Sequence, residues 1–384
     1  MNILFIAYSF SPNRGGVQRV TDLLAKQFLN IGHRVSYLFA LNEMDDSPEA
    51  FPVPCFLMDK PLRESFDMQS IELYHSILLH NKIDIIIHQY PILRKSDFFF
   101  KHALPGVMKI SCFHGAPFGQ LNFVYRQLKT LSLHKKLISL PKYCLQKHLL
   151  RNRFIEINKL SDYQCFLASS YANEVSKILP YSKRGKVVFI PNPNTFKIET
   201  QSCNEKEDLV LFVGRVSDPV KNLIDFIKIW EKTYALYPTW KALIIGDDSN
   251  CKSFKNYIRE NHIENITFTG HTNQIAEYYK KAKILCMTSH HEGWPMVLTE
   301  AMSYGCVPFV YSTFGAVNDM ILNKLTGFTI LPYQMQSMVD CMCSIMSSNS
   351  DWEVLSRNAK NYVARFSIEN VTNTWNHLFL KKNI

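Results

Sequence analysis

The sequence predicts an α/β protein of two domains, each a parallel β-sheet covered by helices. Strand-like apolar runs alternate with helical segments from Asn2 onward, and this alternation restarts once at Asp208. A turn-rich stretch, I-P-N-P-N from Ile190, separates the two series and is followed by the polar segment Lys197–Glu207. The chain has 384 residues, which is long for a single hydrophobic core, so two domains are expected.

The first half opens with a strand over Asn2–Phe10, then a loop that contains Gly15 and Gly16, then a helical segment. Further apolar runs predict strands at His33–Phe39, Ile83–His88 and Val107–Phe113. We place the first domain at residues 1–195.

The second half repeats the pattern. Its strands are expected at Asp208–Val213, Lys241–Ile245, Ile284–Met287 and Val307–Val310, with a helix that starts at Lys221. Ser367 is a suitable N-cap for a C-terminal helix. We place the second domain at 196–366 and expect residues 367–384 to pack back on the first.

Cysteine usage and hydropathy restrict the class of protein. Ten cysteines occur without a C-x-x-C pair, which favours reduced thiols in a cytosolic protein over a disulfide framework or a zinc site. The apolar N-terminal run is short and has no basic leader, so it predicts a strand rather than a signal peptide. No stretch approaches the ~20 apolar residues that span a bilayer. We expect a cytoplasmic protein, at most peripheral on the inner face of the cell membrane.

The net charge of +10 is concentrated in one segment. Residues 121–159 contain nine basic residues and one acidic residue, Glu156, a local balance of +8, with Leu, Ile, Phe and Tyr between them. Such a segment is typical of a helix on an anionic membrane surface, although a solvated basic face explains the charge equally well. No nucleic-acid-binding motif accompanies it, so nucleic acid is not expected as a partner.

The most informative motif is E-G-W-P-M-V-L-T-E, which begins at Glu292 and ends at Glu300. It follows an apolar strand and continues into a short helix that Gly305 would cap. We expect both carboxylates to face one cleft at the carboxyl end of that strand, where ligands bind in α/β sheets. Carboxylates accept hydrogen bonds from hydroxyls and a helix N-terminus favours an anion, a combination that suits a nucleotide sugar.

Two cations follow the first strand of the second half. Arg215 comes directly after the strand, and Lys221 stands at the start of the predicted helix. A cation there opposes the helix dipole at roughly 0.3–1 kcal/mol, a cost that a bound diphosphate would offset. Solvated surface cations are the alternative explanation.

Weaker candidates lie in the first half. Gly15 and Gly16 precede a helix and permit close approach of a phosphate, although a simple turn also explains them. The loop lacks the G-x-G-x-x-G pattern of dinucleotide-binding proteins. His114 ends a strand and precedes a glycine, so it is either a substrate-binding residue or a structural loop residue.

Metal ligation is not expected. His290 and His291 precede Glu292, but the sequence H-E-G-W-P is not the zinc motif H-E-x-x-H. Asp247 and Asp248 lack the further carboxylates that a divalent-cation site needs.

Together these motifs resemble the family 4 retaining glycosyltransferases of GT-B fold, over nearly the whole chain. The motifs that carry the resemblance are G-G-V-Q-R from Gly15, C-F-H-G around His114, I-P-N-P from Ile190, F-V-G-R ending at Arg215 with Lys221-Asn222, G-D from Gly246, F-T-G ending at Gly270, and Glu292 to Glu300 with the following A-M-S-Y-G. The E-x7-E pattern is the most specific of them.

The resemblance implies two Rossmann-like domains and a role for each matching residue. Arg215 and Lys221 would neutralise the departing diphosphate, and Glu292 would contact the hydroxyls of the donor sugar. The sugar and phosphate site would be lined by the backbone of Gly293, Trp294, Pro295, Met296 and Val297. Each of these residues except Pro295 has a backbone N–H to donate.

The remaining matches concern the nucleotide and the first domain. Glu300 would bind the ribose, and the segment around Gly270 and His271 would border the base. Gly16, beside Gly15, would contact phosphate, and His114 would lie near the sugar ring. Trp294 is either a sugar-stacking platform or an aromatic packed at a domain interface.

The implied activity is metal-independent transfer, with retention, of a hexose or N-acetylhexosamine from a nucleotide sugar, with UDP favoured. The acceptor would be a glycan or lipid-linked oligosaccharide in polysaccharide or lipopolysaccharide biosynthesis, and no cofactor is expected. A GT-B phosphorylase or sugar-nucleotide epimerase is one alternative, and a non-enzymatic basic membrane-binding protein is another.

Overall fold

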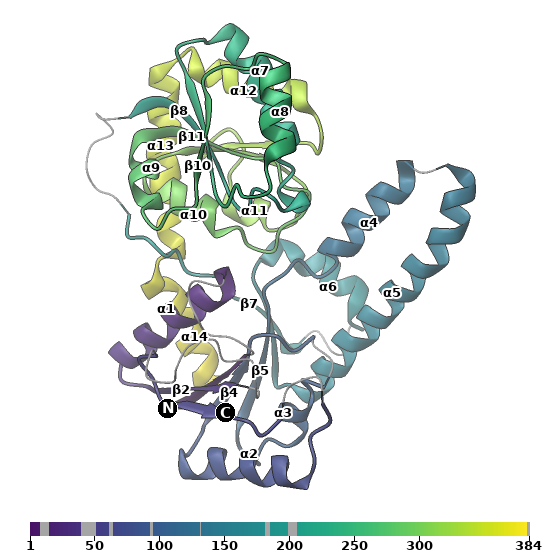
Figure 1. Ribbon diagram of the computed structural model, residues 1–384. Helices are drawn as coiled ribbons and strands as arrows, with labels where there is room; N and C mark the ends of the chain where they lie inside the picture. The colour runs from purple at the N-terminus through teal and green to yellow at the C-terminus, as the bar shows by residue number, and fades with distance from the viewer. Residues whose placement is uncertain are drawn as a thin grey trace. The chain divides into compact units, whose positions relative to one another are not determined.

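We describe a computed structural model of the chain, for residues 1–7, 15–39, 51–60, 64–92, 95–130, 132–180, 185–198 and 206–381. The chain divides into two compact units. Unit 1 is Met1–Thr195 together with Ile368–Ile384, and unit 2 is Phe196–Ser367 (Figure 1).

Unit 1 is built on a seven-stranded parallel sheet of order β3-β2-β1-β4-β5-β6-β7. The strands are β1 Asn2–Ile6, β2 Arg34–Phe39, β3 Cys55–Leu57, β4 Ile85–His88, β5 Met108–Phe113, β6 Tyr163–Phe166 and β7 Val187–Phe189. β1 lies near the centre and pairs with β2 on one side and β4 on the other. Its sequence N-I-L-F-I is apolar after the first residue because helices cover both faces of a parallel sheet.

Helices flank this sheet, and the last helix of the chain is one of them. They are α1 Gly16–Asn30, α2 Met68–His80, α3 Phe98–Lys101, α4 Gly119–Thr130, α5 Leu133–Leu160, α6 Ala172–Ile178 and α14 Ile368–Leu380. α14 packs on α1 through Phe379 and Phe28, whose ring centroids lie 5.4 Å apart. A hydrogen bond of 3.0 Å between His33 Nε2 and Asn376 Oδ1 supports this contact.

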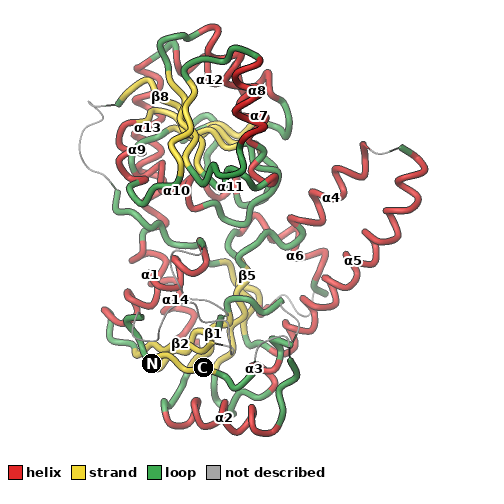
Figure 2. The backbone as a smooth tube through the Cα atoms, viewed as in Figure 1, coloured by secondary structure: helices red, strands yellow, loops and turns green. Residues whose placement is uncertain are grey.

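Unit 2 contains a six-stranded parallel sheet of order β10-β9-β8-β11-β12-β13. The strands are β8 Glu207–Val213, β9 Lys241–Ile245, β10 Ile266–Gly270, β11 Ala282–Met287, β12 Val307–Tyr311 and β13 Phe328–Ile330. The helices are α7 Leu223–Leu236, α8 Lys252–Glu260, α9 Ile275–Lys281, α10 Met296–Ser303, α11 Val317–Met320, α12 Met335–Met346 and α13 Asn349–Val363. Figure 2 shows the strands in yellow between red helices.

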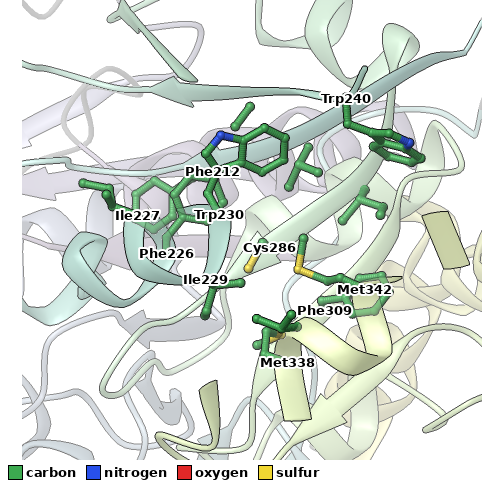
Figure 3. Packing of buried hydrophobic residues seen from close by; sticks show 14 of the residues in the cluster. Phe212, Phe226, Ile227, Ile229, Trp230, Trp240, Cys286, Phe309, Met338 and Met342 are labelled. Carbon is green, nitrogen blue, oxygen red and sulfur yellow. The ribbon is translucent and has the colours of Figure 1, made fainter. Parts of the chain in front are cut away.

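The core of unit 2 lies where α7 and α12 pack on the sheet. Trp230 of α7 is fully buried, and Phe226 and Phe212 pack in the same cluster as Met338 and Met342 of α12 (Figure 3). The indole Nε1 of Trp230 donates a hydrogen bond of 3.0 Å to the Glu264 carbonyl, so its polar atom is satisfied. Replacing such a side chain by alanine costs about 3–5 kcal/mol, so this cluster holds the sheet that presents the site.

Several elements differ from the sequence-based expectation. The strand expected over Asn2–Phe10 is described only as far as Ile6 in β1, because residues 8–14 lie outside the described ranges. β3, β7 and β13 have three residues each, too few for a periodicity to be recognised. The helix expected from Lys221 begins at Leu223, because Pro219–Lys221 forms a 3₁₀ turn and Asn222 adopts a left-handed backbone conformation. Within the expected linker, residues 199–205 also lie outside the described ranges.

Gly246 directly follows β9, at the edge of the unit 2 sheet where the strands end. A substitution at this position tests how closely the backbone packs there. The φ of Gly246 is +151°, and a Cβ placed there would lie 1.8 Å from the Gly214 carbonyl oxygen. We expect Gly246→Ala to lower the free energy of unfolding of unit 2 by about 3 kcal/mol or more, measured by chemical denaturation. Gly115→Ala is the control, because no atom lies within 4 Å of its Cβ position. Equal stability of the two variants would contradict this packing.

Candidate active site

The site in unit 2 forms where two neighbouring strands end. β8 and β11 are parallel and adjacent, with Val210 opposite Ile284 and Leu211 opposite Leu285. The loops that follow them, 214–222 and 288–295, therefore leave the same edge of the sheet side by side. The first loop carries both candidate cations and the second carries Glu292.

Backbone and side-chain hydrogen bonds join these two loops. The His290 N–H donates to the Val220 carbonyl over 2.7 Å. Asn222 is buried and donates from Nδ2 to the Thr288 carbonyl over 3.2 Å, while the Thr288 hydroxyl donates back to the Asn222 carbonyl over 2.9 Å. These bonds fix the backbone on both sides of Lys221, so its side chain starts from a defined position.

Lys221 and Glu292 form an ion pair, with Nζ and Oε1 2.7 Å apart. Each side chain is only 15% exposed, so the pair is partly removed from water. The stem of Lys221 passes Gly214 closely: a Cβ on that glycine would lie 3.2 Å from Lys221 Cε. The sequence predicted each residue separately, and the structure brings them into contact.

Arg215 lies on the same loop but in a different environment. Its side chain is 81% exposed, and its Nη2 lies 2.8 Å from Asp218 Oδ2. Asp218 also caps the 3₁₀ turn, since its Oδ1 accepts the Val220 N–H over 3.0 Å. An exposed pair of this kind is worth little, so a ligand can draw Arg215 away at small cost.

α10 begins at Met296 directly after Pro295, and Gly305 follows its end with φ +78°, as the predicted glycine cap requires. This places Gly293, Met296 and Val297 around the helix N-terminus, beside the loop that carries Glu292.

The side chain of Trp294 is buried against Phe366, with ring centroids 5.0 Å apart and planes at 84°. This ring packs inside unit 2 and is not exposed for stacking on a sugar. The stacking-platform interpretation of Trp294 is therefore wrong, and only its backbone remains as a contact for a ligand.

Glu300 differs from Glu292 in its surroundings. Its residue is 1% exposed, and the Tyr279 hydroxyl donates to Glu300 Oε2 over 3.3 Å. The sequence suggested that both carboxylates face one cleft, whereas the structure leaves Glu292 half-buried and encloses Glu300. The ribose-binding role of Glu300 stays a prediction.

The segment around Gly270 and His271 leaves the sheet at the end of β10. Gly270 has φ +75°, and its carbonyl accepts the Gly246 N–H over 3.0 Å, which joins the ends of β9 and β10. His271 is exposed and interacts electrostatically with Asp247. The pKa of Asp247 is lowered chiefly by the Ser249 backbone N–H and to a smaller extent by His271.

In unit 1, His114 follows β5, and its Nε2 lies 2.5 Å from Gln89 Oε1. Burial lowers the pKa of His114 to about 4, although the neighbouring Asn192 amide opposes the shift. The imidazole is therefore neutral at pH 7. His114 and Gln89 line a pocket of about 190 Å³ together with Tyr90, Phe113 and Phe154.

Gly15 and Gly16 stand at the start of α1. Gly16 is the first residue of the helix, and Gly15 precedes it in an extended conformation with φ 166°. The Gly15 carbonyl accepts the Arg19 N–H over 3.2 Å and so begins the helix.

Sequence reasoning missed the residues that hold the candidates in place. Thr288, Asp218 and Gln89 each bond to a candidate residue or to its loop, and Asn222, which the sequence analysis named only as part of the Lys221-Asn222 motif, bonds to Thr288. Only Asp218 left a signal, because an Asp directly before a proline is typical of the start of a helical turn.

Residues 194–362 match the family model described as "Glycosyl transferases group 1". The match covers most of unit 2 and identifies this unit as similar to glycosyltransferases of that family. The family-level resemblance drawn from the sequence motifs is confirmed.

Curated relatives agree with this assignment. An uncharacterized glycosyltransferase of Haemophilus influenzae is 24% identical over 194 residues, which are 50% of this chain and 55% of the relative. The "GalNAc-alpha-(1->4)-GalNAc-alpha-(1->3)-diNAcBac-PP-undecaprenol alpha-1,4-N-acetyl-D-galactosaminyltransferase" of Campylobacter jejuni is 27% identical over 196 residues, 51% of this chain and 54% of the relative. The chain thus spans about half the length of the curated relatives it matches.

Solved structures show the same fold over the whole chain. The lipopolysaccharide outer core galactosyltransferase WaaB, in its apo form, has a TM-score of 0.72 and 18% identity, with 100% of both chains covered. Anabaena HepE in complex with UDP and glucose has a TM-score of 0.73 and 14% identity, covering 99% of this chain and 100% of that one. The GT-B fold, with two Rossmann-like parallel-sheet domains, is confirmed.

Two buried histidines make the stability of unit 1 depend on pH. Burial lowers the pKa of His88 to about 3 and that of His114 to about 4, from an ordinary value of about 6.5. Between pH 6.5 and 4 the unfolded chain binds protons at both positions while the folded unit does not. We expect the free energy of unfolding to fall as pH is lowered through this window, by up to about 1.4 kcal/mol per pH unit for each histidine.

Denaturant unfolding as a function of pH measures this slope. We expect His88→Gln to make the slope shallower by up to one proton's contribution, whatever its effect on stability at pH 7. His271→Gln, at an exposed position in unit 2, is the matched control. An unchanged slope in His88→Gln would show that His88 takes up no proton on unfolding in this range.

Proposed function

We propose that the protein is a retaining glycosyltransferase that moves a hexose or N-acetylhexosamine from a nucleotide diphosphate sugar, with UDP favoured. The acceptor in this proposal is a glycan or a lipid-linked oligosaccharide, reached in the cytoplasm at the inner face of the cell membrane. The observation that carries the proposal is the Lys221–Glu292 pair, fixed beside Arg215 where β8 and β11 end.

The loop cations would stabilise the leaving group. When the donor binds, its diphosphate competes with Glu292 for Lys221 and with Asp218 for Arg215. As the glycosidic bond breaks, negative charge grows on the departing phosphate, and cations already in position stabilise it without reorganisation. The Arg215 fork can hold two phosphate oxygens while Lys221 acts as a point charge.

Glu292 would orient the donor sugar. Freed from Lys221, its carboxylate accepts hydrogen bonds from sugar hydroxyls, and the backbone around Gly293 and Met296 supplies donors nearby. The two oppositely charged residues of the pair then contact adjacent parts of one ligand. Their contact in the ligand-free structure keeps both charges compensated.

His114 would bind a hydroxyl rather than carry charge. Because burial keeps its imidazole neutral at pH 7, and Nε2–H donates to Gln89 Oε1, the ring can accept a hydrogen bond at Nδ1 but supplies no fixed positive charge. Gln89 orients the ring through the bond to Nε2. In unit 1 the pocket beside His114 is the candidate acceptor-side contact.

Support for the nucleotide and the reaction class comes from the similar proteins. HepE has been solved with UDP and glucose, and WaaB is named as a galactosyltransferase. We propose that the same reaction needs no divalent metal here, since Arg215 and Lys221 supply the positive charge. Transfer that persists at full rate in EDTA is the expected result, and loss of activity restored by magnesium or manganese would contradict it.

A panel of UDP-, GDP- and ADP-sugars tests the donor. We expect UDP-sugars to raise the melting temperature of the purified protein, because a ligand that binds only the folded state stabilises it. Slow hydrolysis of the same UDP-sugars should accompany this stabilisation. If none of the nucleotide sugars changes the melting temperature or is hydrolysed, the proposed function is wrong.

Removal of either cation tests the leaving-group role. We expect Arg215→Ala and Lys221→Ala each to lower kcat at least tenfold, a loss of about 1.4 kcal/mol or more in transition-state stabilisation. Arg259→Ala, on the exposed end of α8, should leave turnover unchanged. Since Lys221→Ala removes the cation paired with Glu292, denaturant unfolding of Lys221→Ala and of the double variant Lys221→Met/Glu292→Gln shows whether the unpaired carboxylate destabilises the fold. Wild-type rates in both single variants would contradict the assignment.

A further inference from the structure

The basic segment of unit 1 forms two long helices that extend away from its sheet (Figures 1 and 2). α5 has 28 residues, which at about 1.5 Å per residue makes it about 42 Å long. Its C-terminal end is anchored in unit 1 by Phe154 and Ile157, both buried. Toward its N-terminal end, the described packing partner is α4.

α4 and α5 contact each other along one side of α5. Tyr143 of α5 stacks on Tyr125 of α4, with centroids 5.4 Å apart and planes at 28°. Tyr143 and Leu128 are buried in this contact, although both belong to helices that are otherwise largely exposed.

The side of α5 opposite Tyr143 is largely apolar, although His134, Pro141 and His148 also lie within it. At about 100° per residue, its exposed apolar side chains span roughly half of the helix circumference. We call this surface the leucine face; its members, each between 45% and 76% exposed, are Leu133, Leu137, Ile138, Leu140, Leu145 and Leu149. Six large aliphatic side chains exposed on about five turns of one helix are far more than scattered surface residues explain.

Basic residues border the leucine face on both edges. By the same angular count, Lys135 and Lys142 lie along one edge, and Lys136 and Lys147 lie along the other, on the side of Tyr143. Lys136 is half-buried there, and the Lys147 Nζ lies 5.9 Å from the centroid of the Phe118 ring. The sequence contains no Asp or Glu between Asp97 and Glu156, so no acidic side chain of this segment offsets them.

We propose that the α4–α5 element docks unit 1 on an anionic lipid bilayer. The leucine face would lie among the upper acyl chains with the helix in the plane of the interface, and the bordering lysines would reach the anionic headgroups. The lysines would add an electrostatic attraction that salt screens, and burial of the leucines would add a part that salt does not weaken. No helix among the described residues is long and apolar enough to cross a membrane.

Charge favours a bilayer over a second copy of the chain. Two leucine faces placed against each other would bring the lysine borders of both copies together, and like charges repel. An anionic membrane complements both the apolar face and its borders. A link between α5 and the acceptor rests on the proposed function. Phe154, near the C-terminal end of α5, lines the same pocket as His114, so the helix that carries the leucine face also borders the candidate acceptor site.

Flotation of the full-length protein with vesicles tests the proposal. We expect the wild type to float with phosphatidylcholine vesicles that contain 30% phosphatidylglycerol, and at least fivefold less with phosphatidylcholine alone. Binding should weaken between about 0.05 and 0.5 M NaCl, as screening shortens the reach of the lysines. Leu137→Ser/Leu140→Ser and Lys135→Glu/Lys142→Glu should each lower the bound fraction at least fivefold.

Matched controls separate docking from general hydrophobicity, charge and folding. Leu236→Ser/Leu331→Ser replaces two leucines of unit 2 that are 64% and 69% exposed, and Lys241→Glu/Lys252→Glu makes the same charge change there. Both controls should float like the wild type. All variants should keep the donor-induced rise in melting temperature, so vesicle binding and the proposed transferase activity can fail independently.

Absence of wild-type flotation at low salt would overturn the proposal. So would equal loss of flotation in the unit 2 controls. If sizing in solution shows a dimer that Leu137→Ser/Leu140→Ser converts to a monomer without change in flotation, the leucine face binds a second copy instead.

Discussion

The contact between Lys221 and Glu292 is the interaction on which the site depends. Its two residues come from different loops, and those loops stay together because β8 and β11 are neighbours and because Asn222, Thr288 and His290 bond across them. A partly buried ion pair adds little net stability, since desolvation offsets much of the attraction. The ion pair matters because it fixes the positions of the two side chains. It holds a cation and an acceptor of hydrogen bonds side by side, where a nucleotide sugar needs a partner for its diphosphate and one for its sugar.

Unit 1 contributes groups of a different kind. His114 is a neutral hydrogen-bonding residue, since burial lowers its pKa and Gln89 orients its ring. The pocket beside it is bordered by Phe154, at the anchored end of the helix whose other end carries the leucine face. In the proposed reaction, charge for the leaving group would come from unit 2, while unit 1 would offer neutral polar groups, an apolar pocket and a basic, apolar helix for an acceptor held at a membrane.

Much of the fold was predictable from the sequence, and the reason is local. β1, β8, β9, β11 and β12 are buried on both faces and read as continuous apolar runs, whereas β3, β7 and β13 are three residues long and give no pattern. The candidate site residues were named from the sequence because their motifs are specific, and their roles stay predictions. Its geometry was not: the burial of Trp294 depends on Phe366, and the enclosure of Glu300 on Tyr279, contacts that only the folded unit creates. The sequence already indicated a basic, apolar surface helix within residues 121–159, but it did not show which side chains are exposed. That needed the structure, which buries Tyr143 against α4 and leaves the leucine face of α5 exposed.

Calorimetric titration of UDP into the wild type, Lys221→Met and Glu292→Gln tests the central claim, that Lys221 exchanges a carboxylate for the donor diphosphate. UDP lacks the hexose that the donor carries. Glu292 should therefore compete with the UDP diphosphate for Lys221 and make no contact with UDP itself. The account predicts at least tenfold weaker UDP binding by Lys221→Met, and binding by Glu292→Gln as tight as the wild type or tighter. Wild-type affinity in Lys221→Met, or a tenfold loss in a folded Glu292→Gln, would contradict it.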